Sequence, residues 1–256
     1  MKHLSINMQW LLIIVFAGAA LCAAPAGIAQ ANNNKPLSFR GPASVETDPS
    51  PNPTPAPSSQ RSSEALNFSV QYFYRTPGQQ TLKPLTDGSM LRSGDHYKIQ
   101  FTPDENCYVY IFQVDSTNTI YPLFPVNDFN GLAATHRNPV RAGATYHLPA
   151  EEKSFFLDQN TGTEIIYFLA FRQANPAWES IVQRLSTGLQ QGDAGLIAAA
   201  SRQISNNIVT MRGVGGVVED TSATTTVELG NVRNELPRQR LEACDSCVSK
   251  VIFLHD

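Results

Sequence analysis

Two cysteines near the C-terminus are the clearest candidates for chemistry in this sequence of 256 residues. Cys244 and Cys247 form a C-x-x-C pair, which can be a redox centre, half of a zinc site or a small disulfide. Redox catalysis usually places the first cysteine at a helix N-terminus, where the helix dipole lowers its pKa. Here the pair precedes a strand-like run at 248–255, so we predict a structural disulfide between Cys244 and Cys247. A thiol-disulfide or redox-sensing function for the pair is the alternative.

The remaining cysteines and histidines give no metal-binding pattern. Zinc at the C-x-x-C pair would need two more ligands, and only Cys107 and scattered histidines could supply them. No two histidines have the i, i+4 spacing of a metal-binding helix. Once Cys22 is removed with a signal peptide, we expect Cys107 to be left as a free thiol, although a bridge from Cys107 to either partner remains an alternative. We therefore predict no metal and no cofactor.

Motifs of catalysis are also missing from the sequence. There is no G-x-S-x-G elbow of a serine hydrolase, and the glycine-rich run 213–216 lacks the Lys-Ser/Thr of a P-loop. Asp158 and Glu164 lie on either side of a turn at Gly162, and we expect such carboxylates to be solvated. The sequence thus predicts a protein that is not an enzyme, unless a hydrolase site is assembled only in three dimensions.

Aromatic residues are the one sign of a binding surface. Four tyrosines lie on predicted strands and are candidates for an aromatic binding face: Tyr72, Tyr74, Tyr108 and Tyr110. Most such rings belong to a hydrophobic core. If one face is open, however, it would form a groove for a peptide or a glycan.

Charge and composition limit the partners. The chain has 19 Lys and Arg against 22 Asp and Glu, a formal net charge of −3, which argues against nucleic-acid binding. Hydrophobic residues make up 42% of the chain, which is enough for a packed core.

Residues 1–31 are typical of a secretory signal peptide. Lys2 precedes an apolar run at 10–20, and Ala29-Gln30-Ala31 is an A-x-A cleavage pattern, so we expect cleavage after Ala31. The alternatives are a weaker site at 24–26, lipid attachment at Cys22, which the preceding Leu21 disfavours, or an uncleaved membrane tether. We predict an exported protein, periplasmic or extracellular, with no membrane span after signal cleavage.

A proline-rich linker occupies 32–64. It contains seven of the 17 prolines of the chain, in a run that favours polyproline II and cannot bury a core. We interpret it as a disordered spacer between the signal peptide and the folded domain.

Residues 65–256 have the pattern of a β-rich domain. Alternating or fully apolar runs predict strands at 66–75, 96–101, 107–114, 120–124, 145–148, 155–157, 164–171 and 248–255. Helical spacing predicts an insert near 176–211, with Asp193 capping its second helix. A short strand at 217–218 is expected to lead into a Thr/Ser-rich loop. The fold class is therefore mainly β: an immunoglobulin-like β-sandwich or related barrel with a short helical insert.

The middle of the chain resembles the bacterial domain of unknown function 4384 family. The resemblance is found in LRSGDHYKIQF (91–101), CYVYIFQVDS (107–116), LFP (123–125), NPVRAGATYHLP (138–149) and TGTEIIYFLAF (161–171). The tail, 212–220 and 244–256, is similar to the segment C-terminal to this domain in some exported members. The resemblance implies a sandwich-like domain used for accessory sensing or binding, and it supplies no catalytic residues.

These observations together predict an exported, non-catalytic β-sandwich module. We expect it to be an accessory binding or sensing domain whose partner is an envelope protein or glycan.

Overall fold

The structure is a computed structural model that describes residues 66–126, 136–211, 216–229, 232–243 and 247–256. The chain divides into two units, Met1–Ala56 and Pro57–Asp256, and every described residue belongs to the second. The predicted signal peptide and the linker through residue 64 lie outside the described residues.

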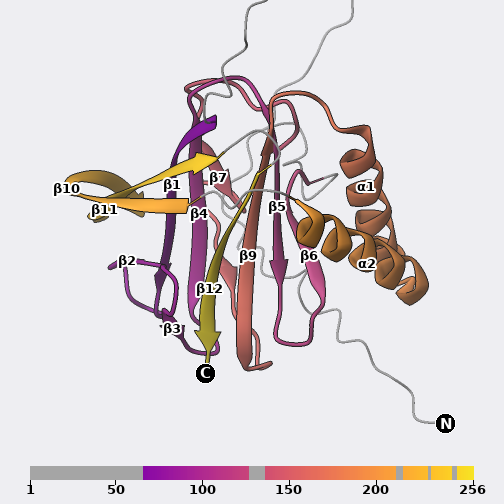
Figure 1. The fold of residues 1–256 in the computed structure, drawn as a ribbon. Helices are drawn as coiled ribbons and strands as arrows, with labels where there is room; N and C mark the ends of the chain where they lie inside the picture. The colour runs from indigo at the N-terminus through magenta and orange to yellow at the C-terminus, as the bar shows by residue number, and fades with distance from the viewer. Residues whose placement is uncertain (1–65, 127–135, 212–215, 230–231, 244–246) are drawn as a thin grey trace, which may run out of the picture. The chain divides into compact units, whose positions relative to one another are not determined.

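Two β-sheets form the framework (Figure 1). The first has the order β10-β11-β1-β4-β7, with β2 pairing with β1 and β8 with β4. Its strands are β1 (Leu66–Arg75), β2 (Lys83–Pro84), β4 (His96–Pro103), β7 (Tyr146–Leu148), β8 (Phe155–Phe156), β10 (Gly216–Leu229) and β11 (Val232–Ala243). The second has the order β3-β12-β9-β5-β6. Its strands are β3 (Met90–Leu91), β5 (Tyr108–Val114), β6 (Ile120–Phe124), β9 (Gly162–Phe171) and β12 (Cys247–His255).

The main hydrophobic core lies between the two sheets. Alternate residues of β1 and β4 point inward and meet the inward residues of β5, β9 and β12. Phe168 of β9 shows the packing, because its ring contacts Phe68 and Phe101 edge-on at centroid distances of 5.0 and 5.5 Å. The predicted mainly β sandwich is confirmed, with two separate sheets rather than a barrel.

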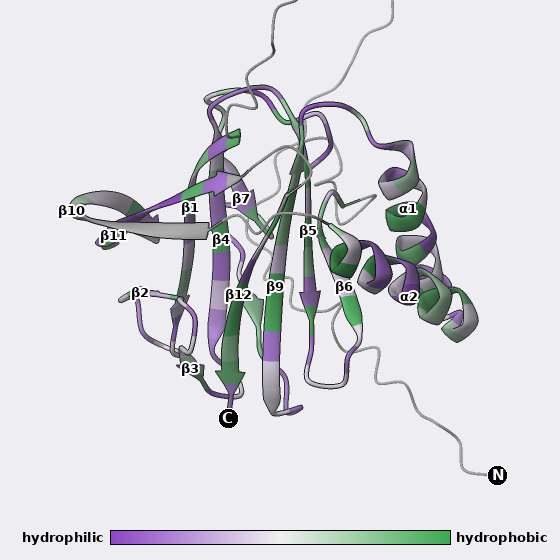
Figure 2. Ribbon diagram, viewed as in Figure 1, coloured by the Kyte–Doolittle hydropathy of each residue, from purple (hydrophilic) through white to green (hydrophobic). Residues whose placement is uncertain are grey.

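Two helices cover the outer face of the second sheet. They are α1 (Pro176–Gln191), capped by Asn175, and α2 (Ala194–Thr210), capped by Asp193, whose Oδ1 accepts from the Leu196 amide at 3.0 Å. Trp178 of α1 packs against Tyr110 and other rings of the sheet. The part of the second sheet under the helices is thus buried on both faces, which is why β5 and the end of β9 form continuous hydrophobic stretches (Figure 2). The predicted helical insert is confirmed.

The long hairpin of β10 and β11 corrects the sequence prediction. A short strand at 217–218 and a Thr/Ser-rich loop were expected, but 216–229 form one strand that pairs with β11, which was not predicted. Threonine is β-branched and suits a strand, whereas the Arg, Glu and Pro of β11 disfavour one. Tertiary contacts decide the outcome, because Val227 and Leu236 pack with Phe73 and Leu82 in a small core of their own.

Candidate functional site

The two cysteines predicted to form a disulfide lie at the start of β12 and just before it. Cys244 is outside the described residues, and Cys247 begins β12, with nothing described of its side chain. Cys107 is a free cysteine and is buried. Burial raises the pKa of its thiol to about 12, and the Glu105 carboxylate adds to the rise. The Cys107 thiolate is therefore scarce at neutral pH, so this residue is a poor nucleophile.

The four candidate tyrosines do not form one open face. Tyr72 lies in the core between the sheets, and Tyr110 lies in the core between the second sheet and the helices. Both rings are buried, while Tyr74 and Tyr108 are half-buried on two different sheets. The structure therefore corrects the expectation of a shared aromatic groove.

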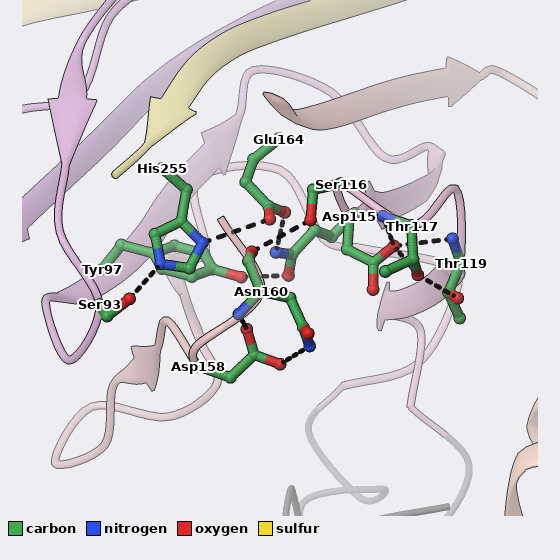
Figure 3. Close-up of polar contacts among 11 residues, drawn as sticks. Ser93, Tyr97, Asp115, Ser116, Thr117, Thr119, Asp158, Asn160, Glu164 and His255 are labelled. Carbon is green, nitrogen blue, oxygen red and sulfur yellow. Dashed lines mark hydrogen bonds and ion pairs between the residues drawn. The ribbon is translucent and has the colours of Figure 1, made fainter. Parts of the chain in front are cut away.

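Five polar side chains instead meet at one end of the sandwich, and we call them the buried polar network: Ser93, Tyr97, Gln113, Glu164 and His255 (Figure 3). Ser93 Oγ lies 3.1 Å from His255 Nε2. His255 Nδ1 lies 3.7 Å from Glu164 Oε1, at ion-pair rather than hydrogen-bond distance. Gln113 Nε2 donates to Glu164 Oε2 at 2.9 Å, and the Tyr97 hydroxyl donates to Gln113 Oε1.

The strand pairing explains how these residues come together. In the antiparallel pair of β9 and β12, Glu164 faces Phe253 and Gly162 faces His255. Residues two apart on a strand share a face, so Glu164 and His255 both point into the space between the sheets with Phe253. Tyr97 comes from β4 in the other sheet, so its bond to Gln113 links the two sheets.

Gly162 allows the turn at Ser116 to approach the start of β9 closely. Its φ of +141° lies in a region that side chains rarely adopt, and an added Cβ would lie 2.7 Å from Ser116 Cβ. A glycine at the start of β9 is thus required both by the backbone and by the close approach of the neighbouring turn.

Glu164 is the electrostatically unusual member of the network. Only 2% of the residue is exposed, which corrects the expectation of a solvated carboxylate. Burial raises the pKa of Glu164 to about 7, and Asp115 and Asp158 add to the rise, while hydrogen bonds from Gln113 and the Ser116 backbone oppose it. Burial and the nearby Glu164 also raise the pKa of Tyr97 well above its usual value. Glu164 is therefore poised to exchange a proton near neutral pH.

Two turns flank the network (Figure 3). Asp115 Oδ1 accepts from the backbone amides of Thr117 and Thr119 at 2.9 and 2.8 Å. Asp158 Oδ1 accepts from the Asn160 amide at 2.8 Å, and Ser116 Oγ donates to the Asn160 carbonyl at 3.0 Å. The two turns are thus tied to each other and fix the negative charges that act on Glu164.

Ser93 contacts His255, and His255 contacts Glu164, which is the arrangement of a Ser-His-acid triad. The surroundings of these three residues, however, do not suit acyl transfer. Such catalysis needs hydrogen-bond donors that stabilise an oxyanion, and these are often backbone amides beside the nucleophile. The amides around Ser93 are already used: the Ser93 amide donates to the Asp256 carbonyl at 3.1 Å and the Gly94 amide to Leu157 at 2.8 Å. The backbone amides of Arg92 and Asp95 also donate hydrogen bonds within this turn. The network can therefore titrate and hold the end of β12 against the turn before β4.

A second feature is an open hollow of about 780 Å³ beside β7, called here the hollow. It is lined by residues 136–139, 141, 144–147, 150 and 151. Its frame is fixed by internal bonds. The Asn138 side chain donates to the Val109 carbonyl and accepts from the Val109 amide, at 2.8 and 2.9 Å. Tyr146 stacks on Phe101 at a centroid distance of 5.0 Å, and its hydroxyl accepts from the Arg141 amide. The hollow is thus preorganised.

The charges around the hollow are mostly positive. Arg137 and Arg141 are exposed, and neither guanidinium has an ion pair or hydrogen bond with the described residues. Glu151 is the one carboxylate among the described lining residues, and its backbone carbonyl accepts from Lys98. Burial, with Lys98 second, lowers the pKa of His147, so its imidazole is neutral at neutral pH. The hollow therefore offers two cations without partners among the described residues, one carboxylate and the neutral imidazole of His147.

Sequence reasoning missed both places for identifiable reasons. Glu164 gave a usable signal, because it is a carboxylate at the head of an otherwise apolar strand, 164–171. Arg137 and Arg141 gave none, since isolated arginines in a loop look like ordinary surface charge. Among the described residues, no three His, Cys, Asp or Glu side chains are grouped so that they could hold a metal ion.

The fold defines the class of this protein: a mainly β domain of two packed sheets with a helical layer on one of them. Residues 90–173 match the family described as "Domain of unknown function (DUF4384)", which confirms the resemblance seen in the sequence. The match runs from β3 to just after β9, so it contains the hollow and four members of the network, but not His255. No match is found among curated proteins or solved structures. No helix within the described residues is both long and apolar enough to span a membrane.

Proposed function

We propose that this protein is an exported, non-catalytic binding module of the cell envelope, and that the hollow is its binding site. The observation that supports it best is the pair of exposed arginines, unpaired among the described residues, at the rim of a rigid, open hollow of about 780 Å³. Arginine is enriched at recognition interfaces relative to the rest of the protein surface, because its guanidinium forms paired hydrogen bonds with anionic groups. A hollow of this size suits a small molecule or a segment of a polymer.

The absence of catalysis is part of the proposal. The backbone amides next to Ser93 in the triad-like arrangement of Ser93, His255 and Glu164 are already occupied, so they cannot stabilise a tetrahedral intermediate. The signal-like residues 1–31 and the spacer at 32–64 support an envelope location, with the domain held away from the surface where it emerges.

The test is co-sedimentation of the full exported chain with envelopes from the producing organism. A wild-type protein that sediments with envelopes, and an Ala144→Trp variant that places a large side chain in the hollow and stays in solution, would support the proposal. Arg238→Gln, an exposed arginine of β11 distant in the sequence from the hollow, is the matched control and should bind as wild type. Equal sedimentation of wild type and Ala144→Trp would refute the role of the hollow.

A further inference from the structure

We propose that the ligand of the hollow is an acidic glycan, whose carboxylates bind Arg137 and Arg141 and whose hydroxyls bind Glu151 and His147. This inference rests on the proposed function and narrows its ligand class. It depends on the combination of charges in the hollow rather than on any single residue.

The two arginines determine the sign of the charge on the ligand, which must be negative. A guanidinium is permanently charged and binds a carboxylate through two parallel hydrogen bonds. Arg137 and Arg141 are four residues apart in one loop, and the Arg141 backbone is held by the Tyr146 hydroxyl at 2.9 Å. Because neither guanidinium has a partner among the described residues, an anionic ligand need not displace an ion pair with any of these residues.

Glu151 and the rings determine the kind of anion. A carboxylate in the lining accepts hydrogen bonds, so the ligand must bring donors as well as negative charge. An acidic peptide segment supplies carboxylates but few donors beyond its backbone amides, whereas each uronic acid unit has a carboxylate and several hydroxyls. His147 is half-buried, and its lowered pKa leaves a neutral imidazole that can exchange hydrogen bonds with hydroxyls.

The aromatic floor is consistent with a sugar. Tyr146 is half-buried and stacks on Phe101 with an interplanar angle of 10°, so its ring is fixed in orientation. A fixed ring beside polar side chains can pack against the apolar face of a pyranose without loss of side-chain entropy.

The experiment measures binding of the full exported chain to polygalacturonate and alginate, which are two polyuronates, by isothermal titration calorimetry. Methyl-esterified polygalacturonate is the neutral counterpart, and polyglutamate is the acidic peptide counterpart. We expect both polyuronates to bind, Arg137→Gln and Arg141→Gln each to weaken binding by about tenfold, and Arg238→Gln to have no effect. We also expect binding to weaken with added salt, because the arginines are exposed.

Three results would overturn the inference. Equal binding of the methyl ester would show that the arginines do not recognise carboxylates, and equal or tighter binding of polyglutamate would assign the hollow to a peptide. Failure of both polyuronates to bind, while Ala144→Trp still abolishes sedimentation with envelopes, would refute the acidic glycan and leave the hollow as the binding site. An Ala144→Trp variant that sediments as wild type would refute the role of the hollow, on which this inference rests.

Discussion

Replacing Glu164 with glutamine tests the electrostatics of the buried polar network. Glutamine has nearly the same shape, and its oxygen can still accept from Gln113 Nε2, which donates to Glu164 at 2.9 Å in the wild type. The change therefore removes a proton-binding site from a buried position while it preserves the packing around it. The measured quantity is the free energy of unfolding as a function of pH.

The sign of the effect is set by the raised pKa. The carboxyl has a pKa of about 7 in the folded state against a usual value of 4.5. Between these values the folded protein keeps a proton that the unfolded chain releases, so stability falls as pH rises through this window. Above about 7 both states are ionised and the loss from this group is complete. Each pKa unit corresponds to about 1.4 kcal/mol, so the total loss has an upper limit of about 3 kcal/mol.

The Glu164→Gln variant should not lose this stability as pH rises, because glutamine has no proton to release. We expect the variant to be about as stable as wild type near pH 4.5, and more stable by about 1 to 3 kcal/mol near pH 8.

The assay is urea unfolding of wild type and variant across this pH range, followed by tryptophan fluorescence. Glu228→Gln, an exposed glutamate of β10, is the control and should leave the pH dependence of stability unchanged. A Glu164→Gln variant with the same pH dependence as wild type, or one less stable than wild type near pH 8, would refute the assignment of a proton to buried Glu164.

Other predictions concern the packing and the cysteines. Gly162→Ala should destabilise the domain by about 2 kcal/mol, because the new Cβ would combine a strained φ with a 2.7 Å clash. Gly78 also has a positive φ but has no neighbour within 4 Å of an added Cβ, so Gly78→Ala should destabilise the domain less. Urea unfolding of the two variants measures the difference. Trp178→Ala should cost about 3 to 5 kcal/mol, because it removes a buried ring from the helix-covered face of the second sheet, and unchanged thermal unfolding would contradict that packing. Cys107 should resist alkylation in the native protein and react once it is unfolded, so labelling of Cys107 without denaturant, detected by mass spectrometry, would argue against its burial. Ser93 should not be labelled by a fluorophosphonate, and stoichiometric labelling would revive the hydrolase interpretation.

The intact mass of the natively produced protein tests the predictions made from sequence alone. We expect a chain beginning at Asn32, with Cys244 and Cys247 joined in a disulfide. A retained N-terminus or a lipid on Cys22 would indicate a tethered protein. Rapid alkylation of the C-x-x-C pair would favour the redox alternative.

The local pattern of apolar and polar residues was sufficient to predict most strands of the sandwich and both helices. Alternation in 66–75 and 96–101 predicted β1 and β4, because a strand with one face toward a core must alternate. The switch to helical spacing after Asn175, with Asp193 as a cap, predicted α1 and α2. The apolar run 107–114 predicted a strand buried on both faces, and the helices are the reason for its second buried face.

The sequence by itself determined the class of fold, the helical insert and the family resemblance, since each depends on residues close together along the chain. Only the tertiary structure decided that β11 is a strand, that Tyr72 and Tyr110 lie in two separate cores, and that Glu164 is buried beside His255. It also decided that Arg137 and Arg141 border a hollow. These outcomes depend on contacts between distant segments, such as the register of β9 with β12, and the energy of burying a charge or a ring is set by those contacts rather than by neighbours in sequence.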